Sequence, residues 1–200
     1  MPTKRRIIDD FARVEVRTRA EWRRWLVAHH ALSPGVWCVT FKKGSGVPSP
    51  GYAAIVEEAL CVGWVDSLPR ALDAERTMLL VTPRKAKSVW SAPNRERVER
   101  LLAAGLMRPA GIASVEIARA NGSWESLAAA ESLEVPADLV KAFRGQRVAR
   151  ANWDAFTPAV RRSILYWVLS AKTAATREKR VAEVVAKAAV GKRANYPADR

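Results

Sequence analysis

The sequence predicts an α+β fold in which a small antiparallel sheet of about three strands is packed by helices and followed by a helical C-terminal region. Three segments are typical of strands, because β-branched, aromatic and other apolar residues dominate them and turn residues bound them: 36–42, 64–68 and 76–82. Elsewhere, apolar residues recur at the spacing of a helix. Hydrophobic residues make up 49% of the chain and eight residues are tryptophans, which is enough to build a core and excludes a disordered chain.

The first helix is predicted to begin after Thr18. Thr18 and Glu21 have the spacing of a capping box, in which each side chain accepts a hydrogen bond from the backbone of the other. This helix ends near His29. A second helix is predicted at 52–62, and Gly63 is its natural stop because glycine adopts the left-handed conformation at low cost.

Helical patterns also fill the C-terminal half of the chain. Start signals stand at Pro136, Thr157 and Thr173, and Gly191 is a stop signal. We expect one structural domain made of four parts: a lead at 1–17, an α+β core region at 18–91, a helical region packed on it at 92–192, and a tail at 193–200.

The chain is strongly basic, with 34 Lys and Arg residues against 20 Asp and Glu residues and a formal net charge of +14. The excess is uneven, since fourteen basic residues from Lys141 onward face four acidic ones, a net charge of +10. A basic helix face can bind phosphates, so nucleic acid is a possible partner. The polyanion-binding candidates are Arg161, Arg162, Lys172, Arg177, Lys179 and Arg180. The alternative is a solvated helix face, and no helix-turn-helix, zinc-knuckle or RNP-type motif accompanies it.

No pattern of residues predicts a reaction. His29 and His30 are adjacent and point in different directions, so they do not predict a metal site. Cys38 and Cys61 stand in apolar surroundings and are expected to be buried free thiols. We therefore assign no catalytic residue, no metal and no cofactor, and we favour a binding module over an enzyme.

The sequence predicts no membrane insertion, because no run of about 18 apolar residues is found. The first residues are basic and lack the apolar region of a signal peptide. We expect a cytoplasmic protein.

A short glycine-rich turn follows the first predicted strand. Backbone N–H groups of such a turn, with a neighbouring lysine, can bind an anion. The anion-binding candidates are Lys43, Gly44, Ser45 and Gly46. The spacing is not that of a phosphate-binding loop, so the alternative is a flexible connector to the next helix.

The stretch from Glu57 to Ser91 contains an isolated acidic residue, Asp66, in a predicted strand. Side chains alternate along a strand, so Trp64, Asp66 and Leu68 are expected to share one side. A carboxylate buried on that side needs a cation or several N–H donors. Arginines at 70, 76 and 84 are the nearest cations in the sequence.

We predict a binding site for a small ligand or a protein partner around Asp66. Aromatic walls with a few polar groups are typical of ligand pockets. The candidates are Trp64, Asp66, Ser67, Arg84, Ser88, Trp90 and Asn94. The alternative is that both tryptophans belong to the core and that Asp66 and Arg84 form a structural ion pair.

Several short motifs of this stretch occur together in one order: Glu57-Glu58-Ala59-Leu60-Cys61, Gly63-Trp64-Val65-Asp66-Ser67, Thr82-Pro83-Arg84 and Ser88-x-Trp90-Ser91. With them, the chain resembles the YdeI/OmpD-associated (OmdA, bacteriocin-protection) family, over about 22–196. The resemblance implies an α+β fold but no established catalytic residue or cofactor. It also implies an uncharacterised protein with a stress- or bacteriocin-protection role.

Overall fold

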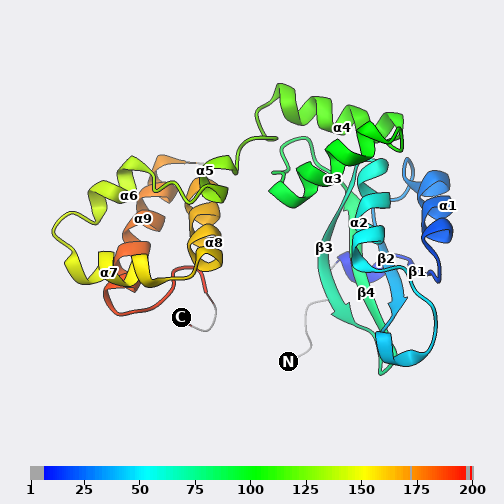
Figure 1. The fold of residues 1–200 in the computed structure, drawn as a ribbon, viewed down its shortest axis with the longest axis horizontal. Helices are drawn as coiled ribbons and strands as arrows, with labels where there is room; N and C mark the ends of the chain where they lie inside the picture. Colours follow the sequence, from blue (N-terminus) through cyan, green and yellow to red (C-terminus); the bar gives the residue numbers. More distant parts are fainter. Residues whose placement is uncertain (1–6, 172, 197–198, 200) are drawn as a thin grey trace. The chain divides into compact units, whose positions relative to one another are not determined.

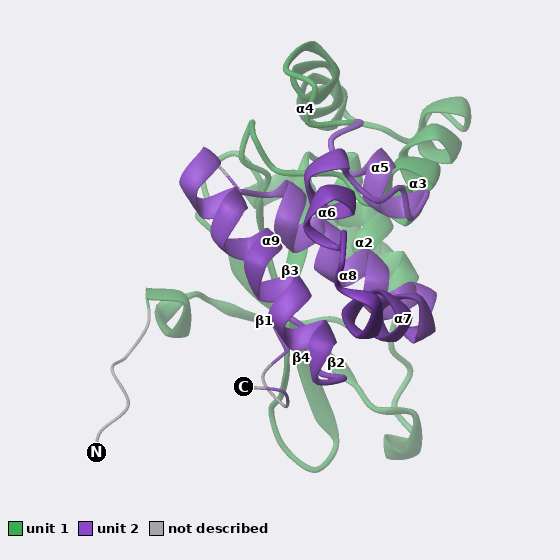
Figure 2. Cartoon of the chain, turned by 90° about the vertical axis from the view of Figure 1, so that its left-hand side faces the viewer, with its two compact units in different colours: residues 1–124 green, residues 125–200 purple. Residues whose placement is uncertain are grey.

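The computed structural model describes residues 7–171, 173–196 and 199. The chain divides into two compact units, Met1–Trp124 and Glu125–Arg200 (Figure 2). The predicted α+β core region ended at residue 91, whereas the first unit continues through two further helices.

The first unit contains a four-stranded sheet and four α-helices among its described residues (Figure 1). Its elements are η1 Ile7–Asp10, β1 Arg13–Glu15, α1 Arg19–His29, β2 Val36–Phe41, η2 Lys43–Ser45, α2 Tyr52–Cys61, β3 Trp64–Ala71, β4 Arg76–Pro83, α3 Ala92–Ala103 and α4 Pro109–Ala120. The predicted α+β class is confirmed, and α1 begins with the predicted capping box at Thr18 and Glu21.

The strand order of the sheet is β1-β2-β4-β3, with the three predicted strands paired antiparallel. The fourth strand, β1, was not predicted, and it pairs parallel to β2. Only Val14 is apolar between Arg13 and Glu15, so this edge strand carries no alternating apolar pattern.

A β-bulge interrupts β3. Asp66 pairs with Val81 and Pro69 pairs with Leu79, so two residues of β3 stand opposite one residue of β4. Trp64 consequently lies in the cluster on one side of the sheet and Leu68 packs in the cluster on the other. The expectation that Leu68 shares a side with Trp64 and Asp66 is wrong, because the bulge follows Asp66 and resets the alternation before Leu68.

Helix α2 lies against one face of the sheet (Figure 1). Its residues Ile55 and Ala59 pack in the cluster that contains sheet residues and α1. The neighbouring residues Val56 and Leu60 pack instead with α3 and α4. One helix therefore contributes to two apolar clusters of the first unit.

The end of α2 lies very close to α4. A Cβ atom added at Gly111 would lie 2.3 Å from the carbonyl oxygen of Cys61, so only glycine fits there. Gly63 has a φ of +76°, and a Cβ there would lie 2.9 Å from the carbonyl oxygen of Ala110. These two glycines allow the backbones of α2 and α4 to approach.

A buried carboxylate connects α1 to α2. Glu58 is only 2% exposed. Its Oε1 accepts a hydrogen bond from Arg19 Nε and its Oε2 accepts one from Arg23 Nε, each at 2.5 Å. The hydrogen bonds to Glu58 are the main cause of the raised pKa of both arginines. The two arginines satisfy a charge that would be costly to bury alone.

The second unit is helical over its described residues. Its elements are α5 Ala128–Glu131, α6 Ala137–Ala142, α7 Arg147–Ala155, α8 Pro158–Leu169 and α9 Ala174–Ala189. The predicted caps at Thr157 and Thr173 are confirmed, since each side chain accepts a backbone hydrogen bond. Trp153 is fully buried in the core of this unit. In the part of the chain that the structure describes, no helix has the length and hydropathy to cross a membrane.

We predict that Glu58→Gln lowers the free energy of unfolding by about 3 kcal/mol, because it removes the buried carboxylate that pairs with both arginines and leaves Arg19 only its ion pair with Glu57. Urea denaturation followed by tryptophan fluorescence measures the change. The control is Glu99→Gln, which removes a surface ion pair with Arg119 at 2.6 Å and should cost less than about 1 kcal/mol. Equal small losses in the two variants would contradict the role given to Glu58.

Candidate functional site

A pocket of about 610 Å³ lies between the start of α2 and the sheet. Most of its lining surface is apolar and comes from residues such as Ile55, Pro69 and Leu79. Its polar lining includes Thr40, Lys43, Tyr52, Asp66 and Ser67. The pocket brings Asp66 and Ser67 of the predicted ligand site together with Lys43 of the predicted anion-binding turn.

The carboxylate of Asp66 is half-buried and faces a tyrosine. Its Oδ2 accepts a hydrogen bond from the Tyr52 hydroxyl at 2.7 Å. Burial, followed by the hydrogen bond and charge of Asp66, raises the pKa of Tyr52 to about 12. Asp66 makes no ion pair within 4.0 Å in the described ranges, so the expected ion pair with an arginine is replaced by a phenol.

Arg84 lies against Trp90 rather than on Asp66. Its guanidinium carbon is 3.7 Å from the centre of the Trp90 ring, and Nη1 donates to the carbonyl oxygen of Val89 at 2.9 Å. Burial lowers the pKa of Arg84 to about 10, and the negative charge of Asp66 acts in the opposite direction. The two residues therefore interact through space without direct contact.

The two predicted tryptophans belong to separate parts of the core. Trp64 and Trp90 are each 1% exposed. Trp64 donates from Nε1 to the carbonyl oxygen of His30 at 3.2 Å, in the cluster between α1 and the sheet. Trp90 packs on Trp124, with the ring centres 4.9 Å apart. The structure does not bring the two indoles together as walls of one pocket.

Of the remaining members of the predicted ligand site, Ser88 and Asn94 do not line the pocket. The Asn94 side-chain oxygen accepts a hydrogen bond from Arg97 Nη1 at 2.8 Å. The Ser88 backbone N–H donates to the carbonyl oxygen of Lys85 at 2.8 Å. Ser67 does line the pocket, and its hydroxyl lies 3.4 Å from the carbonyl oxygen of Leu80.

The glycine-rich turn forms the short helix η2, and Gly46 follows it with a φ of +72°. The N–H of Ser45 donates to the carbonyl oxygen of Lys42, and the N–H of Val47 donates to the Ser45 hydroxyl. The backbone N–H groups of Ser45 and Val47 therefore already donate hydrogen bonds within the turn. Anion binding by Lys43, Gly44, Ser45 and Gly46 stays a prediction, and Lys43 is the member that lines the pocket.

Sequence reasoning missed Thr40, which lines the pocket from β2. Thr40 is 7% exposed, and its hydroxyl has no hydrogen-bond partner within the described ranges. The Thr40 hydroxyl is not one of the fully buried polar atoms that lack a partner in the described ranges, so it is accessible from the pocket and free to bind a ligand group. The only signal for Thr40 in the sequence is its position in the strand. It follows Val36 and Cys38 at alternate positions, so a polar residue stands on the face that these two apolar residues occupy.

The predicted polyanion face is partly occupied by contacts within the second unit. Arg177 pairs with Asp138 at 2.5 Å, and Arg180 donates to the carbonyl oxygen of Trp167. Lys179 is exposed, Arg161 and Arg162 are half-buried, and Lys172 lies outside the described residues. Polyanion binding by this face stays a prediction, with fewer free cations than the sequence indicates.

No group of three or more His, Cys, Asp or Glu side chains that could hold a metal ion occurs in the described ranges. The polar groups at the pocket are hydroxyls, one ammonium and one carboxylate. This set can position a small molecule by hydrogen bonds and charge.

We predict that the Tyr52 phenol ionises near pH 12 in the wild type, because burial and Asp66 favour its neutral form. The raised pKa stabilises the fold fully below about pH 10 and is lost as the pH rises towards 12. The phenolate absorbance of the wild type minus that of Tyr52→Phe measures the titration. Asp66→Asn should move it to lower pH, and an unchanged titration in that variant would contradict the contact.

Comparisons with known proteins give two matches. Residues 14–114 match the model of a domain of unknown function (DUF8412), and residues 132–191 match the model described as Bacteriocin-protection, YdeI or OmpD-Associated. No curated protein and no solved structure matches the chain.

The second match confirms the predicted YdeI/OmpD-associated relationship, but on other residues. The motifs at 57–91 that carried the resemblance lie inside the first match. The pocket beside α2 lies there too, at 40–79. The chain therefore belongs to the DUF8412 family over the half that holds the pocket, and it joins this half to a YdeI/OmpD-associated domain at 132–191.

Proposed function

We propose that the chain is a small-ligand-binding module whose ligand occupies the pocket beside the start of α2. The single observation that carries the proposal is the Thr40 hydroxyl, which has no hydrogen-bond partner in the described part of the chain and lies on the pocket wall, where it is accessible to a ligand. A ligand that hydrogen-bonds this hydroxyl gains a net contribution of about 1 kcal/mol. Apolar walls with a few polar groups are typical of such sites.

The arrangement of charges supports a ligand with an apolar body and an acceptor head group. Helix α2 begins at Gly51 without a side-chain cap, so the N–H groups of its first turn are open to an acceptor. Lys43 adds a positive charge. Thr40 pairs with Thr77, whereas Asp66 pairs with Val81 four residues further along β4, about 14 Å away. An acceptor near Thr40 therefore avoids the Asp66 carboxylate.

The wider role rests on the family description and on the sequence. The description of the model matched at 132–191 supports a role in bacteriocin protection. We keep the cytoplasm as the proposed compartment on the sequence grounds given above. A protein partner stays an alternative occupant of the pocket.

A thermal-shift screen of small metabolites tests the proposal, because a ligand that prefers the native state raises the melting temperature. We predict that a hit raises the melting temperature of the wild type by several degrees and that Thr40→Val removes most of this rise. Without ligand, Thr40→Val should change the free energy of unfolding by less than about 1 kcal/mol, because the hydroxyl has no hydrogen bond within the described ranges to lose.

Thr82→Val is the matched control, since Thr82 is on the same sheet and does not line the pocket. It should keep the full ligand-induced rise. The proposal is wrong if no compound raises the melting temperature, or if every hit raises that of Thr40→Val as much as that of the wild type.

A further inference from the structure

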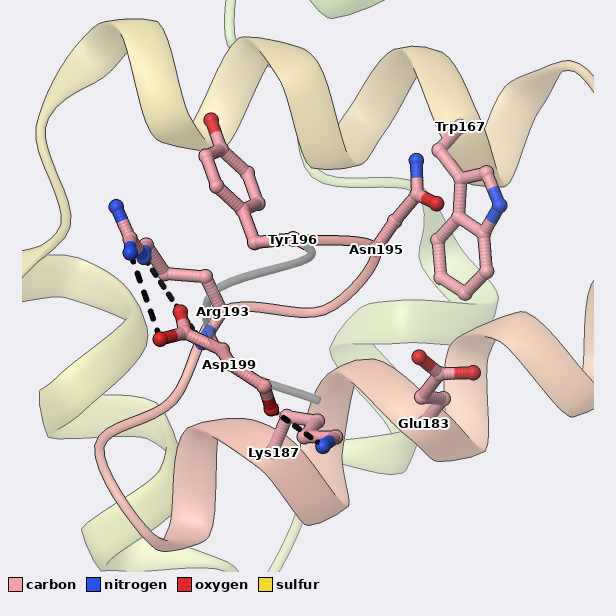
Figure 3. A pocket seen from close by; sticks show the side chains of 7 residues that line it. All are labelled: Trp167, Glu183, Lys187, Arg193, Asn195, Tyr196 and Asp199. Atoms are coloured by element: carbon pink, nitrogen blue, oxygen red, sulfur yellow. Dashed lines mark hydrogen bonds and ion pairs between the residues drawn. The ribbon is translucent and has the colours of Figure 1, made fainter. Parts of the chain in front are cut away.

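A second pocket, of about 270 Å³, lies within the YdeI/OmpD-associated domain and its C-terminal extension. Figure 3 shows its lining side chains, which come from α8, from α9 and from the segment that follows α9. At about 30 Å³ for each water molecule, the space suits a molecule of roughly nine heavy atoms. This pocket is separate from the one beside α2 and does not depend on the function proposed for it.

Two oppositely charged side chains of α9, Glu183 and Lys187, line this pocket without forming an ion pair with each other. Glu183 and Lys187 are four residues apart with the glutamate first, which is the favourable order for an ion pair on a helix. Lys187 Nζ donates instead to the backbone carbonyl oxygen of Asp199 at 2.7 Å (Figure 3). Glu183 is half-buried and has no hydrogen bond or ion pair within the described ranges.

The other two charged side chains of the pocket neutralise each other. Arg193 Nε donates to Asp199 Oδ2 at 2.5 Å, and the same carboxylate oxygen accepts from the Arg193 backbone N–H at 2.9 Å. The charges left without an ion-pair partner are therefore the Glu183 carboxylate and the Lys187 ammonium, which has donors to spare.

The rest of the lining gives the pocket aromatic and amide surfaces. The Trp167 indole lies between the Glu183 carboxylate and the Asn195 amide in the view of Figure 3. Asn195 has a φ of +58°, a left-handed conformation that asparagine tolerates better than most residues. Arg180 stacks on Trp167 at 5.1 Å but is already bonded to the Trp167 carbonyl oxygen and to Ser170.

We propose that this pocket binds a small zwitterion of the α-amino-acid type. The ligand's ammonium group pairs with Glu183, and its carboxylate group pairs with Lys187. Side chains four residues apart on a helix have Cβ atoms about 5–6 Å apart, a span that a ligand with adjacent opposite charges bridges. The side chain of the ligand then packs on Trp167.

The test uses the full-length protein and ¹H–¹⁵N NMR titrations with glycine, L-alanine, L-leucine and L-phenylalanine. Binding should shift the Trp167 indole resonance, identified by its loss in Trp167→Phe. For any amino acid that binds, the N-acetyl derivative lacks the ammonium and the amide derivative lacks the carboxylate. Neither derivative should shift the resonance at the same concentration.

Glu183→Gln and Lys187→Gln should each weaken binding at least tenfold. Glu178→Gln and Lys179→Gln are the matched controls, because both side chains are exposed on α9 and outside the pocket. The controls should bind like the wild type. Glu183→Gln should also keep the wild-type melting temperature, since Glu183 makes no contact that the substitution would break.

Three results would overturn the proposal. The first is that none of the four amino acids shifts the resonance. The second is that an amide or N-acetyl derivative binds as tightly as the free amino acid. The third is that Glu183→Gln binds the amino acid as tightly as the wild type does. The second result would identify a site for a single charge rather than for a zwitterion.

Discussion

The buried carboxylate of Glu58 is the constraint on which the rest of the first unit depends. A carboxylate at 2% exposure is too costly to bury without cations, and Arg19 and Arg23 supply two of them from one helix. Both arginines stay partly exposed, so each guanidinium keeps contact with water while it pairs with Glu58. Helix α1 must therefore lie along the face of α2 that carries Glu58. This face of α2 points away from the sheet residues that α2 covers.

Once α2 is held in this way, its two ends acquire different roles. Its C-terminal end is locked by the close approach of Gly111 to the carbonyl of Cys61. Its N-terminal end, at Gly51, has no side-chain cap and opens onto the pocket over the sheet. Asp66 precedes the bulge of β3, and its carboxylate accepts a hydrogen bond from Tyr52 at the same end of the helix. Rigid packing at one end thus positions the polar groups at the other.

The elements that could be predicted from the sequence are those with a local cause. The cap at Thr18 and the stop at Gly63 depend on neighbouring residues alone, and both were found where the sequence places them. The bulge after Asp66 depends on pairing with a distant strand, which the alternation rule does not include. The consecutive residues Glu57 and Glu58 do not predict that Glu58 is buried, because the arginines that pair with it lie on another helix. For the same reason, Tyr52 could not be identified as the partner of Asp66.

Native-state hydrogen exchange, resolved by residue, tests most directly whether the Glu58 pairs lock α2 to α1 and so stabilise α2 as firmly as the sheet. If they do, the amides of Ile55–Cys61 in α2 exchange only with unfolding of the whole first unit, as slowly as those at the centre of β2 and β4. Glu58→Gln then allows α1 and the N-terminal half of α2 to open before the sheet. Fast exchange of the α2 amides in the wild type, while the sheet stays protected, would contradict the account.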